Sequence, residues 1–534
     1  MKVIIKQISI LIAIFICGTP KYIYCKIPTF FFRPATSEIK PDSLDLIFRK
    51  GQLMRVNDTE RIKLKPNDDG TFKFSPSFLQ PVYLLEITFY YSNDQGRKQI
   101  SVSKYVAEAD DNITVIYSKP KVDKSFFGLL PEMIYKFSGK GSTKYKIFPE
   151  LQKSSSNLEV NLDRSLKKVL GNNEKSKNLK MESLRFEKSA ELQDLMGLLL
   201  SEVVLANNKN LDTLKKHRDD LSGNIYKYLQ YETNKAVYFP WIMDYLANIS
   251  QSEKVRDAVI KFYYENKKYV SINFDSDSLA TISKYYKDYR MYEVMYETSF
   301  EKKSRQFRFE DQYEKLKQIK DNKFRDAVLS YFIYHTWFQQ RIDNRDKQDS
   351  CITDALKFIR SPELRTPILE QQLFSPGNTI PIYSFRNLSG SDITNEDLKG
   401  KVYLIDFYFY GCKGCIEFTK MFKKLVYPNY EDNPEFEVLS VNVDEKKANW
   451  LKAVSTNLYN EDSFINLSTI PNGWKHSFLR HFKIESFPFA LLVDKDGKLI
   501  GRVDGSEPNE INKLIANALA VKSTSQYPNA TNLK

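Results

Sequence analysis

Cysteine is scarce in this chain, with five residues among 534. An exported protein that uses disulfides as structural cross-links carries many cysteines in even numbers, so such a framework is excluded here. Two of the five, Cys412 and Cys415, nevertheless stand only three positions apart. Their closeness in so cysteine-poor a chain indicates a working pair rather than a structural cross-link.

Long hydrophobic runs are also lacking. The apolar stretch at residues 8–17 follows a basic start and covers roughly ten residues, whereas spanning a bilayer takes about 20. This pattern predicts a secretory signal peptide over residues 1–25, and therefore an exported protein. A buried N-terminal element and an uncleaved membrane anchor are the alternatives. Lipid attachment at Cys17 is a third, against which the bulky Phe15 and Ile16 argue.

Strong charge of one sign is absent as well. The net charge of +13 is a mild excess for a chain of this length, and basic clusters such as residues 215–218 are typical of solvated helix faces. No groove-reading motif accompanies them, so we predict no nucleic-acid partner. Association with an anionic membrane surface stays open. The segment Gly139-Lys140-Gly141-Ser142 lacks the spacing of a phosphate-binding loop and is interpreted as a turn that leaves a strand.

Changes of periodicity divide the mature chain into three predicted domains and a tail at 522–534. Residues 27–142 contain short, partly alternating apolar runs between turn residues, which predict a small antiparallel β-sandwich. Residues 144–373 are nearly devoid of glycine and repeat apolar residues at helical spacing, which predicts an all-α domain. The sequence Ser375-Pro376-Gly377 marks the boundary to the last domain, which we place at 375–521.

The last domain is predicted to be a mixed α/β sheet covered by helices on both faces. It opens with a hairpin that turns at Ser389-Gly390. The predicted strands are 402–410, 436–443, 489–493 and 499–503, and the predicted helices follow Cys412 to about Leu425 and span 507–520.

The cysteine pair lies where a buried strand gives way to a helix. At a helix start, unsatisfied backbone N–H groups and the helix dipole stabilise a thiolate, and Lys413 adds a nearby cation. Cys412 is therefore the predicted nucleophile. Cys415, one helical turn onward and more buried, is the predicted resolving cysteine that breaks the mixed disulfide. This chemistry needs no further group, and we predict no cofactor.

Two further positions fit this reaction. Asp406 stands in an apolar strand six residues before Cys412, where a buried carboxylate with a raised pKa could accept the proton of the resolving cysteine. A carboxylate hydrogen-bonded to the backbone is the alternative. Proline cannot donate to a strand ladder, and we predict a cis bond at Phe487-Pro488 that lets the Phe487 backbone pair with an extended substrate. Lys413 and Gly414 complete the predicted substrate contacts.

These residues together resemble the thioredoxin superfamily, and specifically the TlpA-like exported thiol–disulfide oxidoreductases. The resemblance covers about Ser375 to Val521 and implies disulfide-containing protein substrates and a thiol electron donor. It implies the periplasm or cell envelope of a Gram-negative bacterium. The first two domains resemble the N-terminal extensions of such proteins in Bacteroidetes-type bacteria. Two positions depart from the family pattern, which has Trp where this chain has Gly411 and Pro where it has Gly414.

Three other functions compete with this one. A zinc site could combine both cysteines with His476 and His481, but a separation of about 60 residues exceeds finger spacing. A peroxidase would have Pro and Thr or Ser shortly before the reactive cysteine, where this chain has Ile405 and Phe409. A partner-binding scaffold with an inactive thioredoxin-like domain would account for the large share of the chain that redox chemistry leaves unexplained. The predicted function is an exported thiol–disulfide oxidoreductase that acts as a reductant.

Overall fold

The computed structural model describes the chain in thirteen segments, and the predicted signal peptide (1–25) and tail (522–534) lie outside them. The described residues are 28–36, 41–49, 59–75, 82–92, 98–118, 134–170, 189–249, 252–270, 278–302, 308–336, 345–484, 486–503 and 508–521. No helix within these segments combines the length and the apolar character needed to cross a bilayer. The chain forms two compact units, residues 1–305 and 306–534. Helices of the predicted all-α segment fall in both units, and the predicted domain limits stay predictions.

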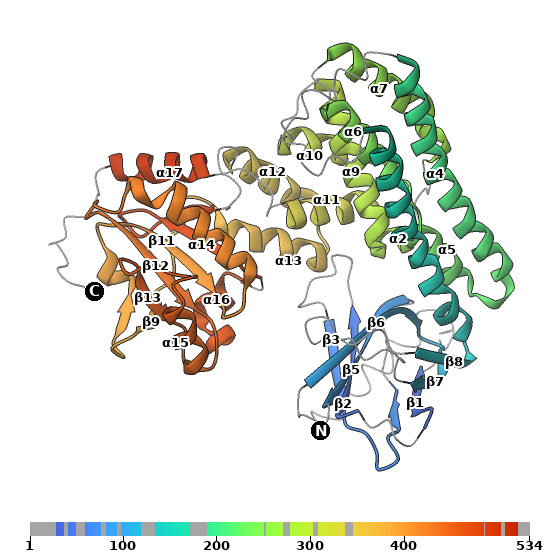
Figure 1. The fold of residues 1–534 in the computed structure, drawn as a ribbon, viewed down its shortest axis with the longest axis horizontal. Helices are drawn as coiled ribbons and strands as arrows, with labels where there is room; N and C mark the ends of the chain where they lie inside the picture. The colour runs from blue at the N-terminus through green and yellow to red at the C-terminus, as the bar shows by residue number, and fades with distance from the viewer. Residues whose placement is uncertain are drawn as a thin grey trace, which may run out of the picture. The chain divides into compact units, whose positions relative to one another are not determined.

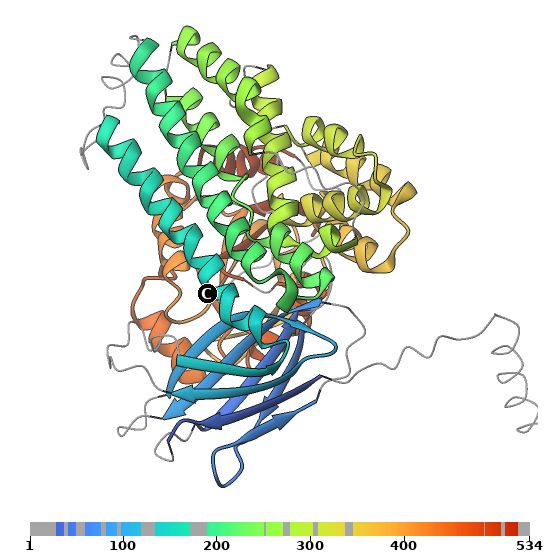
Figure 2. The same cartoon turned by 90° about the vertical axis from the view of Figure 1, so that its right-hand side faces the viewer.

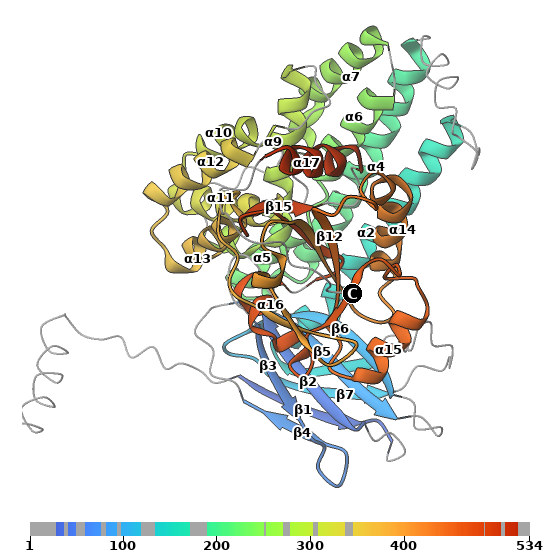
Figure 3. The ribbon, with the colours of Figure 1, turned by 90° about the vertical axis from the view of Figure 1, so that its left-hand side faces the viewer.

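The N-terminal unit begins with two four-stranded sheets, ordered β4-β1-β7-β8 and β3-β2-β5-β6 (Figure 3). Phe and Tyr side chains from both sheets meet in one hydrophobic core. The prediction that all these strands pair antiparallel is wrong for β1 and β7, which run parallel. The strands are β1 (Thr29–Pro34), β2 (Ser43–Arg49), β3 (Thr59–Leu64), β4 (Phe72–Phe74), β5 (Val82–Ser92), β6 (Lys98–Glu108), β7 (Asn112–Ser118) and β8 (Ile134–Lys140).

Beyond the sheets, the described residues of the N-terminal unit are mainly helical, and the two longest of these helices, α2 and α4, run side by side (Figure 2). Leu192, Leu195, Met196 and Leu199 are buried on α4, as their helical spacing predicts. The described helices are α2 (Ser142–Leu170), α4 (Ser189–Lys216), α5 (Gly223–Glu232), α6 (Tyr238–Ile249), α7 (Glu253–Asn266), α8 (Ser278–Ile282) and α9 (Lys284–Lys302), with short 3-10 turns η3 (Arg218–Asp220) and η4 (Lys267–Tyr269).

A cavity of about 620 Å³ lies between α2, α6 and α9 and is lined by aromatic rings and carboxylates. Its carboxylates have partners within the chain. The Tyr238 hydroxyl donates to Glu159 at 2.5 Å, and Lys284 pairs with Asp288 at 2.6 Å. The cavity therefore presents largely satisfied polar groups.

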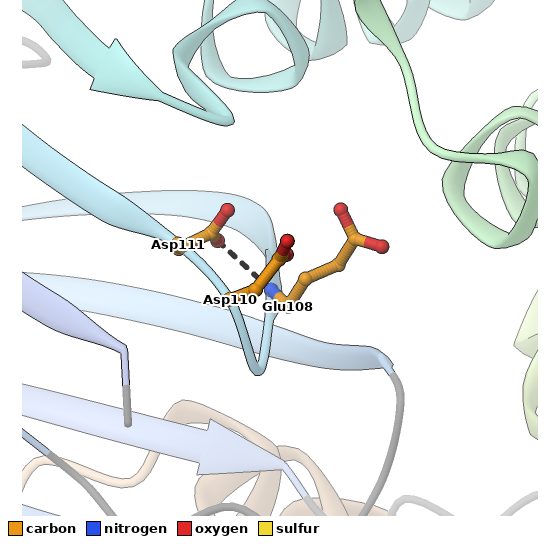
Figure 4. A group of neighbouring side chains, drawn as sticks. All are labelled: Glu108, Asp110 and Asp111. Atoms are coloured by element: carbon orange, nitrogen blue, oxygen red, sulfur yellow. Dashed lines mark hydrogen bonds between the residues drawn. The ribbon is translucent and has the colours of Figure 1, made fainter. Parts of the chain in front are cut away.

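Three carboxylates cluster at the turn between β6 and β7 (Figure 4). The backbone N–H of Glu108 donates to Asp111 at 2.8 Å. The buried Lys144 ammonium pairs with both Glu108 and Asp111, whereas the exposed Lys140 pairs with Asp110 at 2.7 Å. The cluster is thus an internal ion network that ties the start of α2 to the sheets. Gly139 and Lys140 end β8, Gly141 is the turn and Ser142 begins α2, so this segment leaves a strand as predicted. A Cβ at Gly141 would meet the Asp111 carboxylate.

Replacing Lys144 by methionine is expected to destabilise the N-terminal unit. The change leaves two buried carboxylates without their cation, which costs about 3–5 kcal/mol. Lys140→Met is the matched control, since its pair is exposed and is worth at most about 1 kcal/mol. Urea unfolding of the full chain, followed by circular dichroism, measures both variants. Equal unfolding midpoints for the two would contradict a structural role of the Lys144 network.

The described part of the C-terminal unit begins with four α-helices and the 3-10 turn η7 (Gln372–Phe374) and continues into a seven-stranded sheet ordered β10-β9-β13-β12-β11-β14-β15 (Figure 1). The helices are α10 (Phe309–Lys317), α11 (Asn322–Thr336), α12 (Arg345–Phe358) and α13 (Pro362–Gln371). The strands are β9 (Ser384–Asn387), β10 (Asp392–Thr394), β11 (Val402–Tyr408), β12 (Phe436–Asn442), β13 (Ile465–Ser468), β14 (Phe489–Val493) and β15 (Leu499–Val503).

Helices cover both faces of this sheet. Apolar side chains of α14 (Lys413–Leu425) and α17 (Pro508–Ala520) pack on one face, and those of α16 (Ser477–His481) pack on the other. The interior strand β11 is buried along its whole length, parallel to β12 and antiparallel to β14. The predicted strands, the hairpin and the two predicted helices of this domain are confirmed, whereas strand β13 was not predicted. Helix α15 (Lys447–Ser455) and the turns η8 (Asn395–Leu398), η9 (Tyr427–Asn429) and η10 (Gly473–Lys475) complete the unit.

Candidate active site

The two cysteines lie where β11 leads into α14. Cys412 is the N-cap residue of α14, and its sulfur accepts a hydrogen bond from the backbone N–H of Cys415 at 3.1 Å. The two sulfurs are joined in a disulfide. Cys412 is 5% exposed to solvent, whereas Cys415 is fully buried. A helix N-terminus stabilises negative charge, so the more accessible Cys412 is placed to carry the thiolate.

Asp406 sits in the middle of β11, where its backbone lies between Ser440 of β12 and Ala490 of β14. Its side chain is buried, and this burial raises the pKa of the carboxyl well above its ordinary value. The Thr419 hydroxyl bonds to the carboxyl and opposes the rise. Oxygen Oδ1 has no hydrogen-bond partner among the described residues.

Thr419 links this acid to the cysteines, and the sequence reasoning missed it. Its hydroxyl donates to the carbonyl oxygen of Cys415 at 3.0 Å. The Asp406 carboxyl interacts with the same hydroxyl, so the Thr419 side chain contacts both the acid and the backbone of the resolving cysteine. The sequence signal that could have revealed Thr419 is its position one helical turn beyond the second cysteine, on the buried face of α14.

The remaining predicted residues gather at the same place. The Phe487-Pro488 peptide bond is cis. The Pro488 ring lies against the start of α14, since a Cβ added to Gly414 would come within 3.0 Å of the proline Cδ. Lys413 and Gly414 are exposed beside Cys412. The structure thus brings all seven predicted site residues together, and their individual roles stay predictions.

The turn before Cys412 is held by residues from the segments that follow β12 and α15. Gly411 has φ +90, a conformation that favours glycine. Its N–H donates to the Tyr459 hydroxyl at 2.8 Å, and the N–H of Tyr410 donates to Asp444 at 2.8 Å. The Tyr459 ring also stacks on Tyr408, with ring centroids 4.9 Å apart. Tyr459 is therefore a positioning residue, and its distance from the cysteines in sequence hid it.

Replacing Tyr459 by phenylalanine is expected to slow disulfide exchange several-fold. The change leaves the Gly411 N–H without its partner, which costs about 1–3 kcal/mol and loosens the turn that holds Cys412. Tyr430→Phe is the matched control, because its hydroxyl bonds to the Asn512 carbonyl oxygen at 2.7 Å, away from the cysteines. Rates with a model disulfide and urea midpoints measure both variants. Equal slowing in the two would show that Tyr459 acts through stability alone.

The alternative zinc site is not supported by the contacts of His476. One ring nitrogen, Nε2, is 3.1 Å from the Ser384 carbonyl oxygen, and Nδ1 accepts from the Phe478 N–H. Both nitrogens are thus engaged in hydrogen bonds. Burial also lowers the pKa of this imidazole. His476 is therefore a buried structural residue.

Comparison with known proteins finds relatives for the part of the chain that carries this site. Residues 400–499 match the family model described as thioredoxin-like. The thiol-disulfide oxidoreductase ResA of Bacillus cereus is 27% identical over 134 residues, which are 25% of this chain and 72% of that protein. The SCO1 protein homolog of Bacillus subtilis is 27% identical over 175 residues, covering 29% of this chain and 88% of that protein. The thioredoxin domain of a thiol-disulfide oxidoreductase from Bacteroides vulgatus is 27% identical, with a TM-score of 0.24, and the match covers 26% of this chain and 97% of that one.

Proposed function

Because the C-terminal part of the chain is a thioredoxin-like domain related to thiol–disulfide oxidoreductases, we propose that this protein reduces disulfides in protein substrates. The observation that carries the proposal is the Cys412–Cys415 disulfide at the N-terminus of α14, next to a buried acid. A disulfide at a helix start, with one sulfur more accessible than the other, suits reversible exchange.

The reaction starts from the reduced protein. The Cys412 thiolate attacks one sulfur of the substrate disulfide, forms a mixed disulfide and releases the other substrate sulfur as a thiolate, which takes up a proton. The Cys415 thiol then loses its proton to Asp406 in its carboxylate form, directly or through water, and attacks Cys412. This second attack closes the Cys412–Cys415 disulfide and releases the reduced substrate. A separate thiol electron donor returns the pair to the dithiol form.

The proposed place of this reaction is outside the cytoplasm. The short apolar stretch after a basic N-terminus supports a secretory signal. We place the mature protein in the periplasm or cell envelope of a Gram-negative bacterium, where disulfides form and a reductant has substrates. Its positive net charge is compatible with association with an anionic membrane surface.

Insulin reduction tests the proposal. The purified protein with dithiothreitol should precipitate the insulin B chain faster than dithiothreitol alone does. A rate equal to that of dithiothreitol alone would favour the alternative, a scaffold whose thioredoxin-like domain is inactive.

A further inference from the structure

Three aromatic rings form a cluster beside the cysteine pair. We call Phe409, Trp474 and Phe487 the aromatic cluster. The ring centroids of Phe409 and Trp474 are 5.7 Å apart, those of Trp474 and Phe487 are 4.8 Å apart, and those of Phe409 and Phe487 are 5.9 Å apart. Trp474 meets Phe487 edge to face, an arrangement that stabilises aromatic pairs. Each ring comes from a different part of the C-terminal domain, so the cluster exists only in the folded unit.

The cluster is continuous with the sulfur site. Phe409 and Phe487 pack against the buried group that contains Cys412 and Cys415. The Phe409 carbonyl oxygen also accepts from the Cys412 N–H at 3.2 Å, and Phe487 directly precedes the cis Pro488. A substrate that reaches the Cys412 sulfur therefore lies close to these rings.

Trp474 is the exposed residue of the aromatic cluster. Its side chain is 43% exposed, although it is a large apolar residue on a folded domain. The indole packs against two other rings and does not enter the hydrophobic core. An exposed aromatic surface next to a reactive group is a typical contact site for a protein partner.

The segment that carries Trp474 is held in place. The Thr469 N–H and hydroxyl both donate to the Asn442 carbonyl oxygen at the end of β12, at 3.0 and 3.2 Å. Gly473 has φ +52 and lies so close to Glu445 that a Cβ would be 2.4 Å from the glutamate Cγ. A fixed aromatic side chain loses little conformational entropy when a partner covers it. The indole is therefore pre-organised for contact.

We propose that the aromatic cluster is the docking surface for a bulky apolar side chain next to the substrate cysteine. The protein then prefers disulfides in polypeptide segments whose cysteine is flanked by an aromatic or large aliphatic residue. This inference rests on the proposed reductase function. The three rings carry no charge and the indole is partly exposed, so an uncharged polar neighbour would gain little there. An apolar neighbour instead removes its own surface and that of Trp474 from water.

Two disulfide peptides of equal length test the preference, one with phenylalanine and one with serine beside the cysteine. The reduced full-length protein should react with the phenylalanine peptide about tenfold faster, as kcat/KM, since a tenfold ratio needs only modest apolar burial. Trp474→Ala should bring the ratio close to one, and Trp474→Phe should keep most of it. Leu388→Ala is the matched control, because this exposed apolar residue lies in the β9–β10 turn and the ratio should stay at the wild-type value.

The outcomes separate the two proposals. Hydroxyethyl disulfide serves as a small substrate without flanking residues. A wild-type protein that reduces hydroxyethyl disulfide and both peptides at equal kcat/KM, or a Trp474→Ala variant that keeps the wild-type ratio, overturns the docking proposal and leaves the reductase function standing. A wild-type protein that reduces none of the three substrates overturns the reductase function itself.

Discussion

Cys415→Ser should accumulate covalent adducts with substrate proteins, whereas Cys412→Ser should form few and should reduce insulin at the background rate. The first variant keeps the nucleophile but cannot resolve the mixed disulfide, and the second lacks the attacking sulfur. Loss of a nucleophile typically lowers the rate by about 10³-fold or more. Non-reducing gel electrophoresis after incubation with an oxidised model protein measures the adducts, and insulin turbidity measures the rate.

Cys351→Ser is the control for this prediction. Cys351 is a free, buried cysteine, and burial raises the pKa of its thiol to about 12. It therefore stays protonated at neutral pH, and the variant should match the wild type in both assays. Adducts that form equally through Cys412 and Cys415 would contradict the assigned roles, because the structure buries only Cys415 completely.

Asp406→Asn should slow the release of substrate from the mixed disulfide while leaving the first attack by Cys412 close to the wild-type rate. The asparagine keeps the shape of the side chain but cannot accept the Cys415 proton. General-base assistance is typically worth about 10²–10⁴-fold, which sets the expected scale. Rapid quenching of single-turnover reactions separates the two steps. A variant that slows only the first step would contradict the proton-acceptor role.

The same substitution should change how stability depends on pH. Burial holds the Asp406 carboxyl of the folded domain protonated to a pH well above the ordinary value of 3.8. Between the unfolded and folded pKa values the unfolded chain binds fewer protons, so the free energy of unfolding falls as pH rises through that window. Asp406→Asn removes this loss. The stability of the variant relative to the wild type should therefore increase as pH rises above about 4. Urea midpoints of the oxidised proteins at several pH values measure the difference, and parallel pH profiles would contradict it.

The parts of the site that could be predicted from the sequence are those encoded within a few residues. An apolar run that ends at Cys412, and a helical pattern after it, specify the strand, the N-cap and the order of the two sulfurs. Asp406 was detectable for the same reason, because its carboxyl stands in an otherwise apolar stretch of sequence. The cis bond at Phe487-Pro488 was inferred from the proline at a strand start beside a cysteine pair.

The parts that escaped prediction depend on contacts between distant segments. Tyr459 reaches the site from the segment after α15 and Trp474 from the 3-10 turn η10, and no local pattern marks either as a neighbour of Cys412. The parallel pairing of β1 with β7 joins segments about eighty residues apart, and alternation of apolar residues does not specify strand direction. The ion pairs between Lys144 and the carboxylates of the β6–β7 turn also join segments that are distant in sequence, so no local pattern predicts them.

The most direct test is a redox titration of the purified full-length protein in dithiothreitol buffers, with thiol alkylation and mass spectrometry as the readout. The account predicts that Cys412 and Cys415 gain or lose their alkyl labels together, in one two-electron transition, while Cys351 stays a thiol throughout. A pair that remains bridged under reducing buffer, or that never closes under oxidising buffer, would contradict the account.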